Sequence, residues 1–227
     1  MTILAVMGLR REQRILAGPG IQALAGGGDP VRLAALLDAA AVGAGGIISI
    51  GIAGALAPAL KPGDWIIASA VQGKCGETWP TDPAWTARLL AALPGPVTGV
   101  QMCRDAIVAE AAEKASLHRM TGALGVDMES HLAARAARRH GLPFAVARVV
   151  SDGARRSLPP AARVGMRADG GMDLAAVLRS LLTTPWQLPA LIRTGWDAEQ
   201  AFRALLSGRH RLRPGLDAAP PGDAGLV

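Results

Sequence analysis

Short apolar runs alternate with stretches rich in Ala and Leu along most of the chain. Runs without interleaved polar residues predict buried strands, and apolar residues three or four positions apart predict helices. The predicted strands are Ile3–Met7, Ile47–Ile50, Trp65–Val71, Val97–Cys103, Gly125–Met128 and Phe144–Val150. The predicted helices are one that begins near Arg10, one that begins at Pro30 after a capping Asp29, and Ala84–Ala92, Asp105–His118, Ser130–His140, Leu174–Leu182 and Leu188–Leu206. This alternation favours an α/β protein with three αβα layers around a central mixed sheet.

The pattern predicts one domain over residues 1–207. The last residues, 208–227, are rich in Gly, Pro and Ala and are predicted to form a flexible C-terminal tail. The longest apolar run, residues 45–60, contains four glycines and is 16 residues long, whereas a membrane-spanning helix needs about 20. The first residues lack the basic start and cleavage site of a secretory signal, so we expect a cytoplasmic protein.

Composition narrows the class of ligand. The chain has 227 residues, of which 50% are hydrophobic and 19% charged, which excludes a disordered chain. The net charge is +6, but aromatic residues make up 3% and do not alternate with basic ones. Nucleic-acid-binding modules usually combine both, so we expect no nucleic-acid partner. A phosphate or acidic small molecule, or a membrane surface, remains compatible with the charge. The two cysteines and four histidines have no metal-ligand spacing, and we expect no metal and no cofactor.

Two glycine-containing segments at predicted strand ends are candidates for a ligand site. Gly8 to Glu12 offers backbone N–H groups, two arginines and a carboxylate at the start of a helix. Gly51 and Gly54 follow a buried strand and would let a flat ligand approach the backbone. Each segment taken alone is equally compatible with an ordinary turn.

The third candidate pairs two carboxylates. Glu129 follows one predicted strand, and Asp152 ends another about twenty residues later. If these strands are parallel neighbours joined by the helix 130–140, both acids lie on one rim of the sheet. Burying two acids is costly unless a ligand or hydrogen bonds satisfy them. The alternative is that Glu129 caps its own helix and Asp152 caps a turn.

At these residues the chain resembles the purine nucleoside phosphorylase and nucleosidase superfamily. VDMES followed by RVVSD is similar to its acid-Met-Glu and Ser-Asp signature, and the Gly-x-x-x-Glu start and Gly-x-Ala-Gly strand end occur in the same order as in methylthioadenosine/adenosylhomocysteine nucleosidases. The resemblance covers about residues 1–160 and implies a phosphorylase/hydrolase-like fold. GLRREQRIL, GIAGALAPALKPGD and the later SLPP look most like the hopanoid-associated phosphorylase group. That group is implied to release adenine from adenosylhopane in hopanoid side-chain biosynthesis, giving ribosylhopane or its phosphate.

The resemblance also implies residue roles. Asp152 would be the general acid at purine N7, oriented by Ser151 and supported by Arg148, and Glu12 would activate water. Glu129 would bind the ribose hydroxyls, Met128 would pack beneath the sugar, and Val126, Ala53 and Gly54 would border the base. The sequence departs from the family where Ile52 replaces a hydroxyl residue and Ser49 replaces a phosphate-binding arginine. Gly8, Arg10 and Arg11 would then have to bind phosphate, as co-substrate, so phosphorolysis and hydrolysis both stay open.

A hopanoid would require an apolar pocket at the 5′ side of the ribose. The residues that could line it are Trp79, Trp85, Trp186, Leu188, Leu191, Ile192 and Trp196. They are equally compatible with a core or a subunit interface. We expect a nucleoside as the small-molecule partner, a homo-oligomer, and peripheral contact with the inner face of the membrane. The alternatives are a methylthioadenosine or adenosylhomocysteine nucleosidase with a small 5′ pocket, and a non-catalytic nucleotide-binding protein with the same fold.

Overall fold

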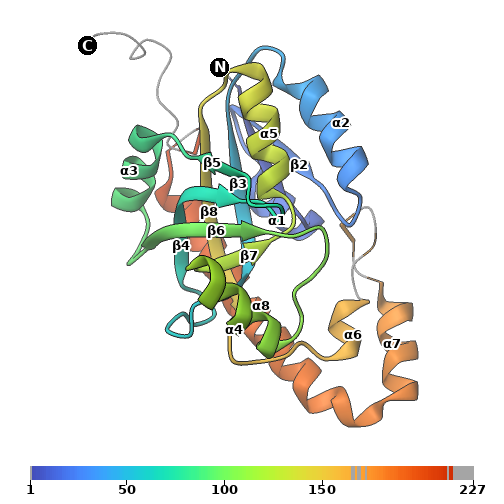
Figure 1. Cartoon of the computed structure of the whole chain (residues 1–227). Helices are drawn as coiled ribbons and strands as arrows, with labels where there is room; N and C mark the ends of the chain where they lie inside the picture. Colours follow the sequence, from blue (N-terminus) through green and yellow to red (C-terminus); the bar gives the residue numbers. More distant parts are fainter. Residues whose placement is uncertain (1, 165–166, 168–169, 172, 214, 217–227) are drawn as a thin grey trace.

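The computed structural model describes residues 2–164, 167, 170, 171, 173–213, 215 and 216 (Figure 1). The strands are β1 (Thr2–Met7), β2 (Ile21–Ala25), β3 (Ala44–Ala55), β4 (Trp65–Gln72), β5 (Thr78–Pro80), β6 (Val97–Cys103), β7 (Gly125–Asp127) and β8 (Phe144–Asp152). The helices are α1 (Arg10–Leu16), α2 (Pro30–Ala41), α3 (Pro83–Ala92), α4 (Ala111–Thr121), α5 (Ser130–His140), α6 (Pro160–Arg163), α7 (Leu174–Thr183), the 3₁₀ helix η1 (Pro185–Gln187) and α8 (Leu188–Arg211). The order of these elements confirms the predicted α/β class.

The strands form one mixed sheet with helices on both sides, as predicted (Figure 1). Side chains alternate between its faces along β1, where Ile3, Ala5 and Met7 pack with residues of α1, α3 and α8. Leu4 and Val6 face the opposite way and pack with residues of α2 and α5. The central strands lie between two apolar cores, which is why their sequences consist mainly of apolar residues.

Five of the strands close into a ring. β3 pairs with β8, β8 with β4, β4 with β6, β6 with β7, and β7 returns to β3. The pairing of β3 with β7 is antiparallel and involves the last residues of β3, Gly54 and Ala55. The prediction that the strands before and after α5 are parallel neighbours is therefore wrong, because β3 lies between β7 and β8. The ring nevertheless brings the ends of both strands to the end of β3.

Several elements differ from the prediction. The helix expected from Asp105 begins at Ala111, because the Asp105 carboxylate contacts Lys74 and His131 instead of capping a helix. β2 and β5 were not expected, since β2 is only half-buried and β5 has three residues. The flexible tail expected from residue 208 also begins too early.

Residues 208–213, 215 and 216 belong to the folded domain. Helix α8 continues to Arg211, and Leu212 and Leu216 are buried beside α3. Trp85 Nε1 donates a hydrogen bond to the Leu216 carbonyl oxygen at 2.8 Å. The rest of the predicted tail, 217–227, lies outside the described residues. None of the described helices combines the length and the apolar character needed to cross a membrane.

Candidate active site

The predicted site residues gather around the last third of β3. Glu12 comes from the first turn of α1, Glu129 from the start of α5, and Arg148 and Asp152 from β8. β8 pairs with β3 in parallel, with Gly51 opposite Arg148 and, after a shift of register, Gly54 opposite Asp152. The sequence motifs that lie far apart along the chain are thus brought together by one strand.

Glu12 lies buried against Gly51. Its side chain is 1% exposed, Oε1 accepts a hydrogen bond from the Ile52 N–H at 2.6 Å, and Oε2 accepts one from the Leu9 N–H at 2.6 Å. A Cβ on Gly51 would overlap Oε1 and would lie 3.1 Å from Nη1 of Arg148, so only glycine leaves room for this carboxylate. Burial raises the pKa of Glu12, although the charge of Arg148 and the two N–H groups oppose the shift.

Arg148 is fully buried behind this segment and is held by hydroxyl and carbonyl groups. Its Nη2 donates to Ser49 Oγ at 2.5 Å, and its Nη1 donates to the Ile52 carbonyl oxygen at 3.3 Å. Nε lies 3.3 Å from Asp127 Oδ2, and Nη2 lies 3.4 Å from Glu129 Oε2. Ser49, noted in the sequence as replacing a phosphate-binding arginine, serves here to hold Arg148.

The structure separates the roles of Asp127 and Glu129 at the start of α5. Asp127 caps the helix, since its Oδ1 accepts hydrogen bonds from the N–H groups of Glu129 and Ser130 at 3.0 and 2.8 Å. Burial acts to raise the pKa of Asp127, but Arg148 and hydrogen bonds from Ser130 and Cys103 outweigh it, and the pKa lies below its ordinary value. Asp127 is thus the charged partner of Arg148.

Glu129 makes no side-chain cap, which removes the capping alternative for this residue. Its Oε1 lies close to Gly8, which follows β1, and a Cβ at that position would be 2.9 Å away. The absence of a side chain at Gly8 therefore leaves room for the Glu129 carboxyl. Burial raises the pKa of Glu129 to about 8; Arg148 opposes the shift, and the charges of Asp127 and Glu12 add to it. The site therefore holds a carboxyl that is protonated at neutral pH and can both donate and accept hydrogen bonds.

Asp152 lies beside Gly54, on the neighbouring strand β8. It is paired with a residue that the sequence analysis did not identify. Lys114 of α4 is fully buried, and its Nζ forms an ion pair with Asp152 Oδ2. The same Nζ donates to the Arg156 carbonyl oxygen at 3.0 Å. Ser151 Oγ is 2.8 Å from Asp152 Oδ1 and 3.1 Å from the Ala53 carbonyl oxygen.

The signal that could have found Lys114 is its rarity. The chain has three lysines, and this one stands in a helix whose neighbouring positions include the buried Leu117. A lysine is almost never fully buried without a partner, so a lysine on the buried face of a helix indicates an acid nearby.

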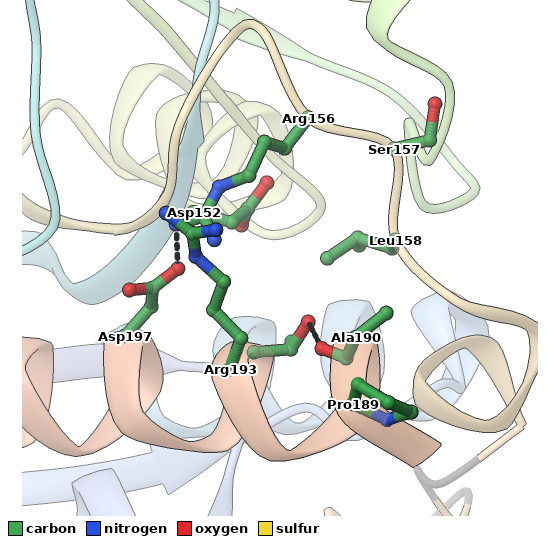
Figure 2. Close-up of a pocket in the computed structure, with 9 residues that line it drawn as sticks. Asp152, Arg156, Ser157, Leu158, Pro189, Ala190, Arg193 and Asp197 are labelled. Atoms are coloured by element: carbon green, nitrogen blue, oxygen red, sulfur yellow. Dashed lines mark hydrogen bonds and ion pairs between the residues drawn. The ribbon is translucent and has the colours of Figure 1, made fainter. Parts of the chain in front are cut away.

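A cavity of about 290 Å³ opens beside Asp152 (Figure 2). It lies between the loop after β8, which supplies Arg156, Ser157 and Leu158, and the face of α8 that carries Arg193 and Asp197. Arg156 pairs with Asp197 across it. The cavity gives a ligand of small-molecule size access to the Asp152 carboxylate.

The residues expected to bind phosphate are not gathered around an empty anion site. Gly8 contacts the Glu129 carboxyl. The Arg10 N–H donates to the Gly170 carbonyl oxygen, and the Arg11 side chain pairs with Glu199 and lies over the Phe202 ring of α8 at 4.1 Å. The structure therefore directs Arg11 toward α8.

The remaining predicted residues are divided between the site and the rest of the molecule. Val126 lies beside Gly54, at 3.6 Å from a Cβ built there, and Met128 lines a small hollow with Glu129 and residues 27–30. Trp79 and Trp85 are buried in the two main cores, so their predicted place in an apolar pocket is wrong. Leu191 is half-buried, and the exposed residues of the predicted lining are Trp186, Leu188, Ile192 and Trp196. Among the described residues, no group of three or more His, Cys, Asp or Glu could hold a metal.

The geometry fits acid–base chemistry on an extended ligand. Gly51 and Gly54 are three residues apart on an extended strand, which separates them by about 10 Å. Glu12 stands at one end of this span and Asp152 at the other. The end of β3 therefore carries two carboxyl groups, one of which can donate a proton while the other accepts one.

The chain is similar to known proteins in sequence family and in fold. The profile of the Phosphorylase superfamily matches residues 13–183. No curated protein sequence matches the chain. Among solved structures, a 5′-methylthioadenosine/S-adenosylhomocysteine nucleosidase from Helicobacter pylori is similar with a TM-score of 0.60 and 16% identity, over 93% of this chain and 99% of that one. An S-adenosylhomocysteine nucleosidase from Streptococcus pyogenes has a TM-score of 0.59 and 18% identity, over 91% and 96%. A futalosine hydrolase from Helicobacter pylori has a TM-score of 0.55 and 17% identity, over 66% and 90%.

Proposed function

The chain belongs to the phosphorylase superfamily, and on that premise we propose that it cleaves the N-glycosidic bond of a purine nucleoside and releases adenine from adenosylhopane. The observation that carries the proposal is the pair of carboxyl groups, Glu12 and Asp152, packed against Gly51 and Gly54 of one strand. That spacing suits a nucleoside whose base lies at Gly54 and whose ribose lies toward Gly51.

The proposed reaction uses both carboxyl groups. Asp152 gives a proton to purine N7, the bond between the anomeric carbon and the base breaks, and its electron pair leaves with the neutral base. Water adds to the oxocarbenium-like carbon while Glu12 takes its proton. A raised pKa suits Glu12 to this task, because the best general base has a pKa near the working pH.

Lys114 and Glu129 assist the reaction at the base and at the ribose, respectively. Asp152 is paired with the Lys114 ammonium, so the proton that it gives to the base is supplied by this pair, with Asp152 standing between Lys114 and purine N7. Glu129 hydrogen-bonds the ribose hydroxyls as a neutral carboxyl, and the nearby Asp127 balances the charge of Arg148.

Water is favoured over phosphate as the acceptor. An incoming phosphate at the Gly51 end would meet the carboxyls of Glu12 and Glu129. Among the described residues, the cation in contact with Glu129 is Arg148, which is already engaged by Asp127. A dianion gains too little there to offset its desolvation.

The hopanoid substituent is proposed from the sequence resemblance and from the surroundings of the cavity. Leu158, Pro189 and Ala190 give its wall an apolar part, and the first turn of α8 continues to exposed apolar side chains. The alternative substrate is methylthioadenosine or adenosylhomocysteine, which the names of the similar solved structures favour. Both substrates would use the same carboxyl groups.

The test is adenine release from adenosylhopane in detergent, with methylthioadenosine in parallel, each with and without phosphate. We expect release from adenosylhopane at a rate that phosphate does not change. Faster release from methylthioadenosine would replace the proposed substrate with the smaller one, and a strict need for phosphate would replace water as the acceptor. No release from either would leave a non-catalytic nucleotide-binding protein as the better interpretation.

A further inference from the structure

Exposed apolar side chains form two rows on consecutive helices at one end of the molecule. The first row is Leu174, Leu178 and Leu182 on α7, and the second is Leu188, Ile192 and Trp196 on α8. Both rows have a spacing of four residues, which places each on one side of its helix. Trp186 of η1 lies in the turn between them. We call these seven side chains the apolar surface.

The apolar surface is outside the packed layers. α7 has no buried residue, and it packs on α6 and η1 rather than on the sheet (Figure 1). Leu182 is 85% exposed, Trp186 78% and Trp196 73%. Scattered single apolar residues are normal on a protein surface, but a periodic set of this size marks an interaction site.

The charges around the apolar surface select its partner. Between Leu174 and Trp196 the sequence contains no Asp or Glu, and its charged residues are Arg179 and Arg193. Asp173 and Asp197 flank this stretch, but Asp173 caps α7 and Asp197 pairs with Arg156. Two copies of the chain joined through this surface would therefore bring arginines together without an acid between Leu174 and Trp196 to pair them. An anionic membrane offers both the apolar phase and the opposite charge.

We propose that α7, η1 and the start of α8 dock this protein on the surface of an anionic lipid bilayer. The two rows of apolar side chains enter the boundary between headgroups and acyl chains, as amphipathic helices do. Trp186 and Trp196 stay at that level, where the indole ring suits a region that is apolar on one side and wet on the other. Arg179 contacts the lipid phosphates.

Docking in this way brings the cavity beside Asp152 close to the bilayer. Pro189, Ala190 and Arg193 line that cavity and lie in the same turns of α8 as Leu188 and Ile192. A ligand held partly in the membrane could therefore reach the cavity without crossing water. The docking itself does not depend on the proposed substrate, since it requires no turnover.

The test is binding of the full chain to vesicles made of equal parts phosphatidylcholine and phosphatidylglycerol, compared with phosphatidylcholine alone. We expect binding to the anionic vesicles that falls with added salt, and quenching of tryptophan fluorescence by brominated lipids. Trp65, Trp79 and Trp85 are buried, so the quenched emission must come from Trp186 and Trp196. Leu178→Glu and Leu182→Glu should each weaken binding by about tenfold or more.

Two controls make the result decisive. Met120→Glu, on α4, changes a side chain that is 78% exposed but stands outside the apolar surface, and it should bind vesicles as the unchanged chain does. Adenine release from a soluble nucleoside by Leu178→Glu and Leu182→Glu should equal that of the unchanged chain, which separates failure of docking from failure of the proposed activity. Vesicle binding that the glutamate variants retain would overturn the proposal. So would a dimer in sedimentation that Leu182→Glu converts to monomers.

Discussion

At the scale of single residues, the sequence named most of the residues that the structure brings together at the end of β3, but not how the charges of their carboxyl groups are balanced. Glu12, Glu129, Arg148 and Asp152 follow from motifs at strand ends, because strand ends are where an α/β sheet leaves side chains free. Lys114 does not belong to any motif, and its contact with Asp152 depends on how α4 packs on the loop after β8. Long-range packing of this kind leaves no periodic signal in the sequence.

The first prediction concerns Asp152 as the proton donor. Asp152→Asn keeps the shape of the side chain but removes its proton, so we expect kcat for base release to fall by about 100-fold or more. Steady-state measurement of adenine release checks this. Asp197→Asn is the matched control, since Asp197 lines the same cavity but pairs with Arg156, and its effect on kcat should be small. Equal losses in the two variants would contradict the role given to Asp152.

The second prediction concerns pH and stability. The pKa of Glu129 is raised from 4.5 to about 8 in the folded chain, so its contribution to stability is complete below pH 4.5 and is lost as the pH rises through about 8. Glu129→Gln removes this proton exchange. Between those pH values, the free energy of unfolding of the unchanged chain should fall relative to that of the variant by more than about 1 kcal/mol. Urea titrations across this range measure it, and parallel curves would show that Glu129 is ionised in the folded chain.

At the scale of elements, the apolar pattern predicted most of the strands and helices, but it did not predict their neighbours. β3, β8 and β4 are all mainly apolar, so the apolar pattern does not distinguish which strand pairs with which. The start of α4 was misplaced because Asp is a common helix-capping residue, whereas the Asp105 carboxylate contacts Lys74 and His131. Capping is a local rule, and here two tertiary contacts override it.

The third prediction tests how closely α1 packs on β3. Gly51→Ala would place a Cβ against the Glu12 carboxylate and 3.1 Å from Arg148, so Glu12 must move. We expect kcat/KM to fall by about 100-fold or more, because a small displacement of a catalytic group has a large effect on rate. Gly195→Ala on α8 meets no atom within 4 Å and serves as the control. It should keep full activity and gain up to about 1 kcal/mol from helix propensity. Normal kinetics of Gly51→Ala would argue against Glu12 as the base.

At the scale of the whole molecule, the C-terminal segment closes a core that begins at the N-terminus. Leu212 and Leu216 pack in the same core as Ile3 of β1 and Leu89 of α3. The composition of the last twenty residues predicted a tail because Gly, Pro and Ala dominate it. Composition averages over a segment, whereas two leucines and one carbonyl group are enough to anchor its described part, up to Leu216, in the core.

The fourth prediction follows from that closure. Leu216→Ala should lower the free energy of unfolding by about 2 to 5 kcal/mol, because the side chain is fully buried and the change leaves a cavity. Denaturant titration gives the value. Leu206→Ala removes the same atoms from a side chain that is 44% exposed and should cost much less. Similar costs for the two changes would mean that the segment is not anchored in solution.

The closed ring of strands also fixes an order of events during synthesis. β8 lies between β3 and β4, yet its synthesis begins about 70 residues after that of β4 has ended. Until then β3 and β4 lack the strand that joins them, and such a distant pairing is slow to form. Arg148 and Asp152 belong to β8, so neither charged side chain can be buried before this strand is synthesised. The candidate site therefore forms only when β8 inserts between β3 and β4.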